Sequence, residues 1–228
     1  MNSINWRKPA ERLSLLPGEI HLWRASLARN IDSLAAILSY EELQRGQRFR
    51  CEEHRRRFCL ARAGLRFILA HYLPIAPRQI VFREGPYGKL YLAGGAMELQ
   101  FNLSHSRDLA LYAVTLDCEI GVDTEWINPD LPVQPLVARF FAPSEQAILD
   151  LPASQQLAAF YRLWTRKEAY LKALGLGLSG LSHALTEDRP GSIMGVEPAP
   201  EYAGALALAG DHRIDPAHLN YFQIFDIC

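Results

Sequence analysis

Short runs of alternating apolar and polar residues predict β-strands in the first half of the chain. In residues 19–27, Ile20 and Leu22 alternate with His21 and Trp23, which is the two-residue period of a strand. Glycine and proline turn signals separate further runs of this kind. These further strand candidates are Ile80–Arg83, Lys89–Leu92, Leu109–Leu116 and Glu119–Glu125.

Helical periodicity marks two other regions. Apolar residues recur at helical spacing across Glu41–Tyr72, and Pro74 closes that segment. In the second half, Pro143-Ser144-Glu145 predicts a helix start and Pro152 its end, after which Ser154 caps a longer helix to about Leu174. Strands and helices are grouped along the chain instead of alternating strictly, which indicates the α+β class.

Composition limits the classes of partner. The 228 residues carry 24 Lys and Arg against 25 Asp and Glu, so a net charge of −1 gives no general attraction to nucleic acid or to an anionic membrane. The N-terminal residues lack a secretory apolar region, and the most apolar stretch near the C-terminus is too short to span a bilayer. We therefore expect a cytoplasmic, monomeric protein with scattered, reduced cysteines.

Two carboxylates share one face of the strand predicted at 119–125. Gly121, Asp123 and Glu125 are two residues apart and therefore point to the same side. Paired carboxylates repel unless a cation lies between them, and oxygen ligands of this kind suit Mg²⁺. Gly121 is interpreted as leaving room for a bulky ligand. Taken alone, the pair is explained more simply as a solvated acidic face.

A third carboxylate, Glu168, lies on the apolar stripe of the helix predicted at 154–174. It follows Trp164 by four residues and precedes Leu171 by three. A carboxylate on a buried face is costly unless it is paired or bound to a metal. Two interpretations stay open: an i, i+4 ion pair with Lys172, or a metal site completed with Asp123 and Glu125.

Two polar stretches offer contacts for phosphate. Phe101-Asn-Leu-Ser-His-Ser106 is expected to form a loop with several hydrogen-bond donors, and the alternative is a turn that satisfies its own backbone. No nucleophile elbow surrounds Ser104, which argues against serine hydrolase chemistry. Between Arg45 and Arg66 the chain carries eight arginines, which form either a solvated face or a dock for phosphates. Those predicted to line one helical face are Arg48, Arg55, Arg62 and Arg66.

The segment Gly175-Leu-Gly-Leu-Ser-Gly180 matches the glycine pattern of dinucleotide-binding turns. It follows a helix, whereas that turn must join a strand to a helix. We interpret it as a helix C-cap followed by a loop.

Together these stretches resemble the 4′-phosphopantetheinyl transferases of the surfactin-synthetase-activating type. Gly121-Val-Asp123-Thr-Glu125 matches the family pattern G-[IV]-D-x-E, and Trp164-Thr-Arg-Lys-Glu168-Ala-Tyr-Leu-Lys172 matches W-x-x-K-E-[AS]-x-x-K. The 101–106 stretch and Gly88-Lys89 match two further elements. The resemblance extends from about Leu38 to Leu178.

This resemblance implies transfer of the 4′-phosphopantetheine arm of coenzyme A to a serine of an apo acyl or peptidyl carrier protein, with release of 3′,5′-ADP. Such carriers serve fatty-acid, polyketide and nonribosomal peptide synthesis. The implied metal is Mg²⁺, with Mn²⁺ as a possible substitute, held by Asp123, Glu125 and Glu168. The implied catalytic residues are Asp123, Glu168 and Lys172. The implied coenzyme A contacts are Arg45, Arg57, Lys89, Ser104, His105 and Lys172, with Arg45, Arg57 and His105 at the 3′-phosphate and Lys89 near the adenine.

The resemblance also implies two pseudo-symmetric lobes, each a small, mainly antiparallel sheet packed with helices, with the active site in the cleft between them. We expect an N-terminal lobe at 1–117 on the coenzyme A side and a C-terminal lobe at 118–228 with the metal and catalytic carboxylates. The chain departs from the family at Leu90, where proline is usual, and at Glu42, where a second basic residue is common. The alternatives are a non-catalytic module that binds coenzyme A or carrier, and a metal-dependent nuclease.

Overall fold

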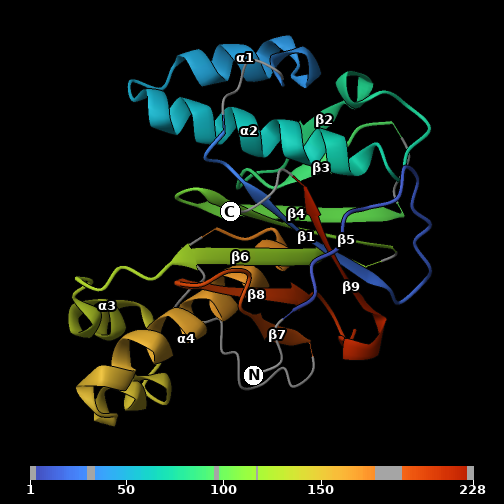
Figure 1. Cartoon of the computed structure of the whole chain (residues 1–228). Coiled ribbons are helices and arrows are strands. Elements are labelled where there is room, and N and C mark those ends of the chain that lie inside the picture. Colours follow the sequence, from blue (N-terminus) through green and yellow to red (C-terminus); the bar gives the residue numbers. More distant parts are fainter. Residues whose placement is uncertain (1–3, 30–33, 95–97, 117, 178–191, 225–228) are drawn as a thin grey trace.

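The computed structural model describes residues 4–29, 34–94, 98–116, 118–177 and 192–224 (Figure 1). Within these residues it is a mixed α+β fold of small, mainly antiparallel sheets packed with helices, which confirms the fold class expected from the sequence. The strands are β1 Ile20–Ser26, β2 Phe82–Glu84, β3 Leu90–Leu92, β4 Leu99–Ser106, β5 Leu109–Leu116, β6 Ile120–Trp126, β7 Ile193–Val196, β8 Tyr202–Leu208 and β9 Leu219–Ile224. The α-helices are α1 Tyr40–Gln47, α2 Glu52–Leu69, α3 Val133–Phe140 and α4 Ala153–Leu174.

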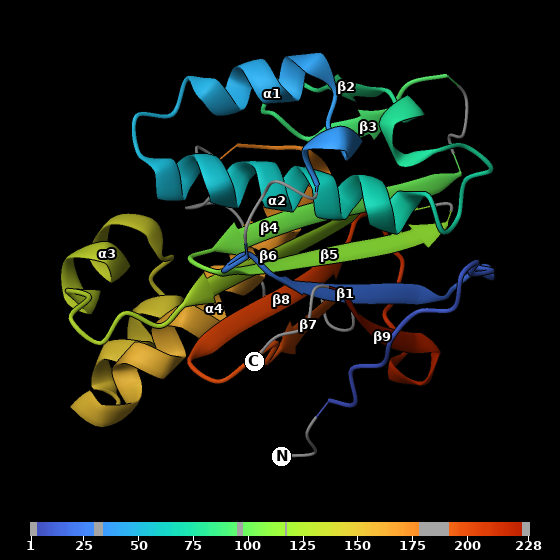
Figure 2. The same ribbon diagram turned by 45° about the horizontal axis from the view of Figure 1, so that its top comes forward.

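The elements stack in layers (Figures 1 and 2). A sheet of order β4-β5-β1-β9 packs one face against α2, where Trp23, Leu65 and Tyr112 share a core. Its other face packs on a second sheet of order β6-β8-β7, through a core that includes Leu22 and Val122. Helix α4 covers the outer face of the second sheet. Strands β2 and β3 form a separate hairpin.

Side chains of β4 join the two larger sheets. The Asn102 side chain accepts a hydrogen bond from the Val122 amide at 3.0 Å, and the Ser106 hydroxyl accepts one from the Trp126 amide at 3.1 Å. The expectation of a loop at 101–106 is therefore wrong, because this stretch is a strand whose polar residues alternate and face β6. Hydrogen bonds across the seam offset the cost of burying them.

The region predicted as one long helical segment is divided between α1 and α2. Helix α1 begins with a capping box in which Ser39 and Glu42 exchange side-chain-to-backbone hydrogen bonds. Arg48 is its C-cap, so Arg48 does not lie on the same helix as the other three arginines of the predicted face. Arg66 is only 2% exposed and pairs with Glu42. The prediction of a single arginine face is therefore wrong.

The second half differs from the sequence prediction in its helix starts. The segment at Glu145–Asp150 is a 3₁₀ helix, and α4 begins at Ala153 after Pro152, so Ser154 lies inside the first turn and is not the cap. Helix α3, which contains Pro135, is not among the helices expected from the sequence. Proline is tolerated there since it lies in the first turn.

The end of α4 agrees with the sequence prediction. Gly175 has φ +67° and caps the helix in the left-handed conformation. The remainder of the glycine-rich segment, from residue 178, lies outside the described residues.

The last described strand returns to the first sheet. Strand β9 pairs in parallel with β1, with Ile20 opposite Leu219 and Ala25 opposite Ile224. The predicted division into lobes at residues 117 and 118 stays a prediction. The pairing shows that β9, from the second predicted lobe, lies in the same sheet as β1, from the first. Among the described helices, none combines the length and the apolar character needed to cross a membrane.

Candidate active site

Gly121 allows β6 and α4 to approach each other closely. A Cβ atom at this position would lie 2.0 Å from the Ala169 carbonyl oxygen and 2.3 Å from the Ala173 amide nitrogen. The interpretation that Gly121 leaves room for a ligand is therefore wrong, because the backbone of α4 fills that space. This contact places the helix that carries Glu168 and Lys172 against the strand that carries Asp123.

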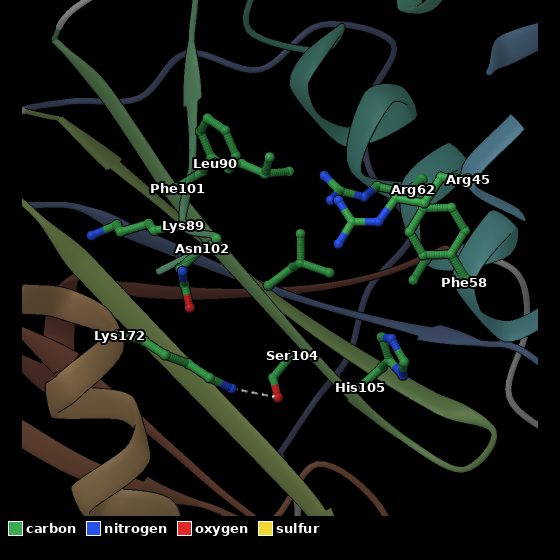
Figure 3. Close-up of a pocket in the computed structure, with 13 residues that line it drawn as sticks. Arg45, Phe58, Arg62, Lys89, Leu90, Phe101, Asn102, Ser104, His105 and Lys172 are labelled. Carbon is green, nitrogen blue, oxygen red and sulfur yellow. Dashed lines mark hydrogen bonds between the residues drawn. The ribbon is translucent and has the colours of Figure 1, made fainter. Parts of the chain in front are cut away.

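Lys172, Asp123 and Ser104 form the polar centre of the site. The Lys172 ammonium donates to Ser104 Oγ at 2.9 Å (Figure 3). It also donates to Asp123 Oδ1 at 2.6 Å. The Ser104 hydroxyl in turn donates to the same Asp123 oxygen at 2.8 Å. Asp123 is only 2% exposed. The described ion pairs of Lys172 thus involve Asp123 and do not include the i, i+4 partner Glu168 that was one interpretation of the sequence.

Glu125 and Glu168 lie within electrostatic reach of this centre. Burial raises the pKa of Glu168 to about 7; Lys172 opposes the shift, and the charges of Asp123 and Glu125 add to it. Burial and then the charge of Asp123 raise the pKa of Glu125, whose carboxylate accepts a hydrogen bond from Ser106 at 2.7 Å. No described residue forms a hydrogen bond or ion pair with Glu168. The negative charges of the three carboxylates therefore repel one another, and partial burial reduces the screening of this repulsion by solvent.

These carboxylates have the donor chemistry of a divalent-cation site. Asp123 Oδ2 is buried and has no hydrogen-bond partner among the described residues, a costly arrangement that a cation would relieve. As they stand, however, the described His, Cys, Asp and Glu side chains include no group of three gathered closely enough to hold a metal. The residues therefore fit a divalent cation in their type, their charge and the unsatisfied Asp123 oxygen, and not in their present spacing.

A cleft of about 350 Å³ opens beside this centre. Ser104 and Lys172 line one part, and Arg45, Arg62 and His105 line another (Figure 3). The remaining lining residues are Phe58, Ala61, Gly88, Lys89, Leu90, Phe101, Asn102 and Leu103. The cleft thus lies between α2, the β2–β3 hairpin, β4 and α4, and its polar walls are mainly cationic.

His105 lines the same wall of the cleft as these cations. Surrounding protein atoms, and next the charges of Lys172, Arg57 and Arg62, lower the pKa of His105 to about 4. Because His105 as a whole is exposed, contact with solvent limits the effect of burial on its pKa. The charges of the three cations are therefore the better-supported cause of the lowered pKa. An anion bound in the cleft would reverse the effect of those cations.

Two predicted coenzyme A contacts are engaged elsewhere. Arg57 donates to Asp108 at 3.1 Å and pairs with Glu53 at 2.6 Å, and it does not line the cleft. The Lys89 ammonium pairs with Glu119 and donates to the Ala173 carbonyl at 2.9 Å, so it ties the hairpin to the end of α4. Burial lowers the pKa of Lys89, and Glu119 opposes that shift. Their assignments to coenzyme A stay predictions.

Arg45 and Glu42, by contrast, have clear surroundings. Arg45 lines the cleft, and its exposed guanidinium reaches Glu84 at 3.3 Å. Glu42, the departure from the family, accepts from Arg66 Nε at 2.6 Å and completes the capping box. Its charge is therefore used within the protein and is not presented to the cleft.

Some residues of the site were not singled out from the sequence. Phe58 lines the cleft one helical turn before Arg62, an arginine already predicted to lie on a helical face, and that spacing could have indicated it. Behind the site, Lys167 is fully buried and donates to Glu145 at 2.5 Å. No sequence signal links those two residues, because the pair joins separate elements.

The comparisons with known proteins agree with the geometry. The family model described as the 4′-phosphopantetheinyl transferase superfamily matches residues 119–208. The 4′-phosphopantetheinyl transferase HetI of Nostoc sp. is 41% identical over 222 residues, which cover 90% of this chain and 94% of that protein. The chain belongs to the 4′-phosphopantetheinyl transferase family. This transferase is also similar to psf-1 of Bacillus pumilus, at 33% identity over 83% of this chain and 80% of that protein.

A third relative covers less of the transferase. The Bacillus subtilis 4′-phosphopantetheinyl transferase is 32% identical over 163 residues, which are 70% of each chain. The segment matched by the family model begins just before β6 and ends with β8, so it contains Asp123, Glu125, Glu168 and Lys172. The arginine-bearing wall of the cleft lies before that segment.

Proposed function

We propose that the transferase moves the 4′-phosphopantetheine arm of coenzyme A to a serine of an apo acyl or peptidyl carrier protein and releases 3′,5′-ADP. The observation that carries this proposal is the cluster of Lys172, Asp123 and Ser104, which borders a cleft with mainly cationic polar walls. Coenzyme A supplies phosphates that such a cleft attracts. Family membership supports the same reaction.

We propose that the pyrophosphate of coenzyme A lies at the Lys172 and Ser104 end of the cleft. The ammonium and the hydroxyl there are 2.9 Å apart and both can donate to phosphate oxygens. Arg45 and His105 line another part of the cleft and suit the 3′-phosphate. Lys89 borders the cleft from the hairpin, where the adenine would lie.

The reaction forms one P–O bond and breaks another. The carrier serine oxygen attacks the phosphorus that bears the pantetheine arm, and the bridging bond to 3′,5′-ADP breaks. The candidate acceptor of the serine proton is Glu168 or a water that it orients; burial raises the pKa of Glu168 to about 7, which suits a general base at neutral pH. Lys172 stabilises the charge that develops on the leaving phosphate.

We further propose that Asp123, Glu125 and Glu168 hold Mg²⁺, with Mn²⁺ as a substitute. The unsatisfied Asp123 Oδ2 and the raised pKa of Glu125 and Glu168 support this set. When bound, the cation neutralises pyrophosphate charge and improves the leaving group. Lys172 donates to Asp123 Oδ1, which leaves Oδ2 as the Asp123 oxygen that such a cation would satisfy.

The decisive experiment is the intact mass of an apo carrier protein after incubation with coenzyme A, Mg²⁺ and the transferase. The expected result is a gain of one phosphopantetheine group, absent when the carrier serine is replaced by alanine. Omitting coenzyme A should abolish the gain, and a chelator should do so if the metal proposal is correct. Binding of coenzyme A without any mass gain, across acyl and peptidyl carriers, would favour the non-catalytic alternative instead.

A cytoplasmic location and a monomeric state remain part of the proposal. The near-neutral net charge supports a partner recognised through a local surface instead of through a general attraction to nucleic acid. Light scattering at several protein concentrations would test the monomer, and a mass that rises with concentration would contradict it.

A further inference from the structure

Arg107 occupies a turn position that glycine usually fills. It is the first of the two residues that join β4 to β5, since Ser106 pairs with Leu109 across the hairpin. Its φ is +47°, in the left-handed region, and a two-residue hairpin with this geometry at its first position favours glycine there. A longer side chain in this region costs free energy, and residues strained in this way cluster at functional sites.

The side chain of Arg107 is held against Trp126 at the end of β6. Its guanidinium carbon lies 3.3 Å from the centre of the Trp126 ring, in a cation–π contact. Arg107 is exposed and Trp126 is partly buried. Stacking uses the flat face of the guanidinium and leaves the N–H groups at its edge free to donate. No described residue forms a hydrogen bond or ion pair with them.

The carboxylates near this arginine are engaged by other residues. Asp108, the next residue in the turn, accepts from Arg56 at 3.0 Å and from Arg57 at 3.1 Å. Glu125 accepts from Ser106 at 2.7 Å. The exposed guanidinium therefore offers a fork of donors that fits a carboxylate from outside the protein. Because the indole ring already positions this fork, little conformational freedom is lost when it binds.

The stacked pair lies beside Glu125 but outside the cleft. The Trp126 amide donates to Ser106 Oγ at 3.1 Å, and the Ser106 hydroxyl donates to Glu125 at 2.7 Å. Figure 2 shows the turn between β4 and β5 near the end of β6. Strand β4 lines the cleft as far as His105, and neither Arg107 nor Trp126 borders it. The pair is therefore placed to contact a molecule that approaches Glu125 from outside the cleft.

We infer that Arg107, stacked on Trp126, binds a carboxylate on the surface of the apo carrier protein and so helps to dock it. This inference rests on the proposed function, in which coenzyme A fills the cleft and the carrier serine must reach the reacting phosphorus from outside. The carrier is then the substrate that meets the open guanidinium. Trp126 adds an apolar surface next to the charge, and arginine and aromatic residues are both enriched where proteins bind each other.

Arg107→Gly removes the side chain without straining the turn. Glycine suits a φ of +47°, so the melting temperature of this variant should equal or exceed that of the wild type. Binding is measured by titration with an apo acyl carrier protein and with an apo peptidyl carrier domain, each with its acceptor serine replaced by alanine. Arg107→Gly should weaken binding of the tighter of the two by about three- to tenfold. Arg107→Lys should recover part of the affinity, because it keeps the charge and loses the planar fork.

Two further measurements distinguish docking from a structural role. In the transfer assay, Arg107→Gly should raise KM for the carrier by a similar factor and leave kcat and KM for coenzyme A within about twofold of the wild type. Added salt should weaken carrier binding more in the wild type than in Arg107→Gly, because exposed charges are screened. A structural role would instead lower kcat or the melting temperature and leave the salt dependence of binding unchanged.

Glu201→Gly is the matched control. Among the described non-glycine residues, Glu201 is the other one with a positive φ, at +63°, and it is exposed on the turn before β8. Its replacement relieves the same kind of strain but removes no cation, so carrier binding should stay within about twofold of the wild type. An equal weakening in Glu201→Gly would overturn the docking assignment. Unchanged carrier binding in Arg107→Gly, or equal losses of carrier and coenzyme A, would overturn it as well.

The intact-mass assay separates this inference from the proposed function, because the binding titration needs neither coenzyme A nor turnover. If Arg107→Gly weakens carrier binding as expected but the wild type modifies no carrier, the transfer proposal fails and the docking assignment stands. If carriers are modified and Arg107→Gly binds them as the wild type does, the docking assignment fails alone. Where a modified carrier binds too weakly to titrate, its KM decides in the same way. A wild type that neither binds nor modifies a carrier would overturn both.

Discussion

Gly121→Ala tests whether the contact between β6 and α4 positions the catalytic groups. The added Cβ would lie 2.0 Å from the Ala169 carbonyl oxygen, whereas ordinary contact begins at 3.4 Å, so strand and helix must separate by about 1.4 Å. The three obstructing atoms, at Ala169, Lys172 and Ala173, are all backbone and cannot rotate away. A shift of this size should move Glu168 and Lys172 relative to Asp123.

Two magnitudes follow from that displacement. Overpacking a tight contact costs about 1–3 kcal/mol of unfolding free energy. A displacement of about 1 Å in a catalytic group costs on the order of a hundred-fold in rate. We therefore expect a folded variant with moderately lowered stability and a much larger loss of transfer. Urea unfolding and single-turnover transfer, measured on one preparation, give both quantities.

Gly195→Ala is the matched control in the same sheet. A Cβ at Gly195 meets no atom within 4 Å, so this variant should keep both stability and rate. If Gly121→Ala kept wild-type stability and rate as well, the close approach would not position the site. A loss of stability with an unchanged rate would show that the contact supports the fold alone.

Other variants and conditions test the charged groups. Asp123→Asn should abolish transfer while circular dichroism stays unchanged, and near-normal turnover would contradict the proposed metal site. Mn²⁺ titration should show weaker binding at pH 6 than at pH 8, because Glu168, with a pKa of about 7, takes up a competing proton as the pH falls; Glu168→Gln should remove most of this pH dependence, and retention of all of it would assign the proton elsewhere. Burial lowers the pKa of His21 to about 4, from about 6.5 when unfolded, so its contribution to stability is complete above pH 6.5 and is lost as the pH falls to 4, by roughly 3 kcal/mol. Urea unfolding at several pH values should show this loss in the wild type, and an equal loss in His21→Gln would refute it.

Alternating residue types predicted several strands, although burial itself does not alternate along β1 or β5, because the first sheet is covered on both faces. Strand β1 has alternation that is visible in the sequence, and its prediction at 19–27 is confirmed. Strand β4 was missed because the polar residues Asn102, Ser104 and Ser106 suggested a loop, although their alternation with Phe101 and Leu103 has the period of a strand. Their burial depends on partners in β6, about twenty residues later, and local propensity carries no information about such partners.

The same limit applies to the site, where the sequence identified residue types better than their pairings. Spacing places Lys172 one turn from Glu168, but the close contact at Gly121 brings it onto Asp123 and Ser104 instead. Spacing likewise offers several arginines for one phosphate, and the choice among them depends on how α2 is rotated over the first sheet. That rotation is set by the buried side chains Phe58, Ala61 and Leu65, which turn Arg62 to the cleft and Arg57 to Asp108. A pattern of charge in the sequence can therefore mark a helix as a candidate phosphate site, whereas the packing of its apolar residues decides which arginine faces the cleft.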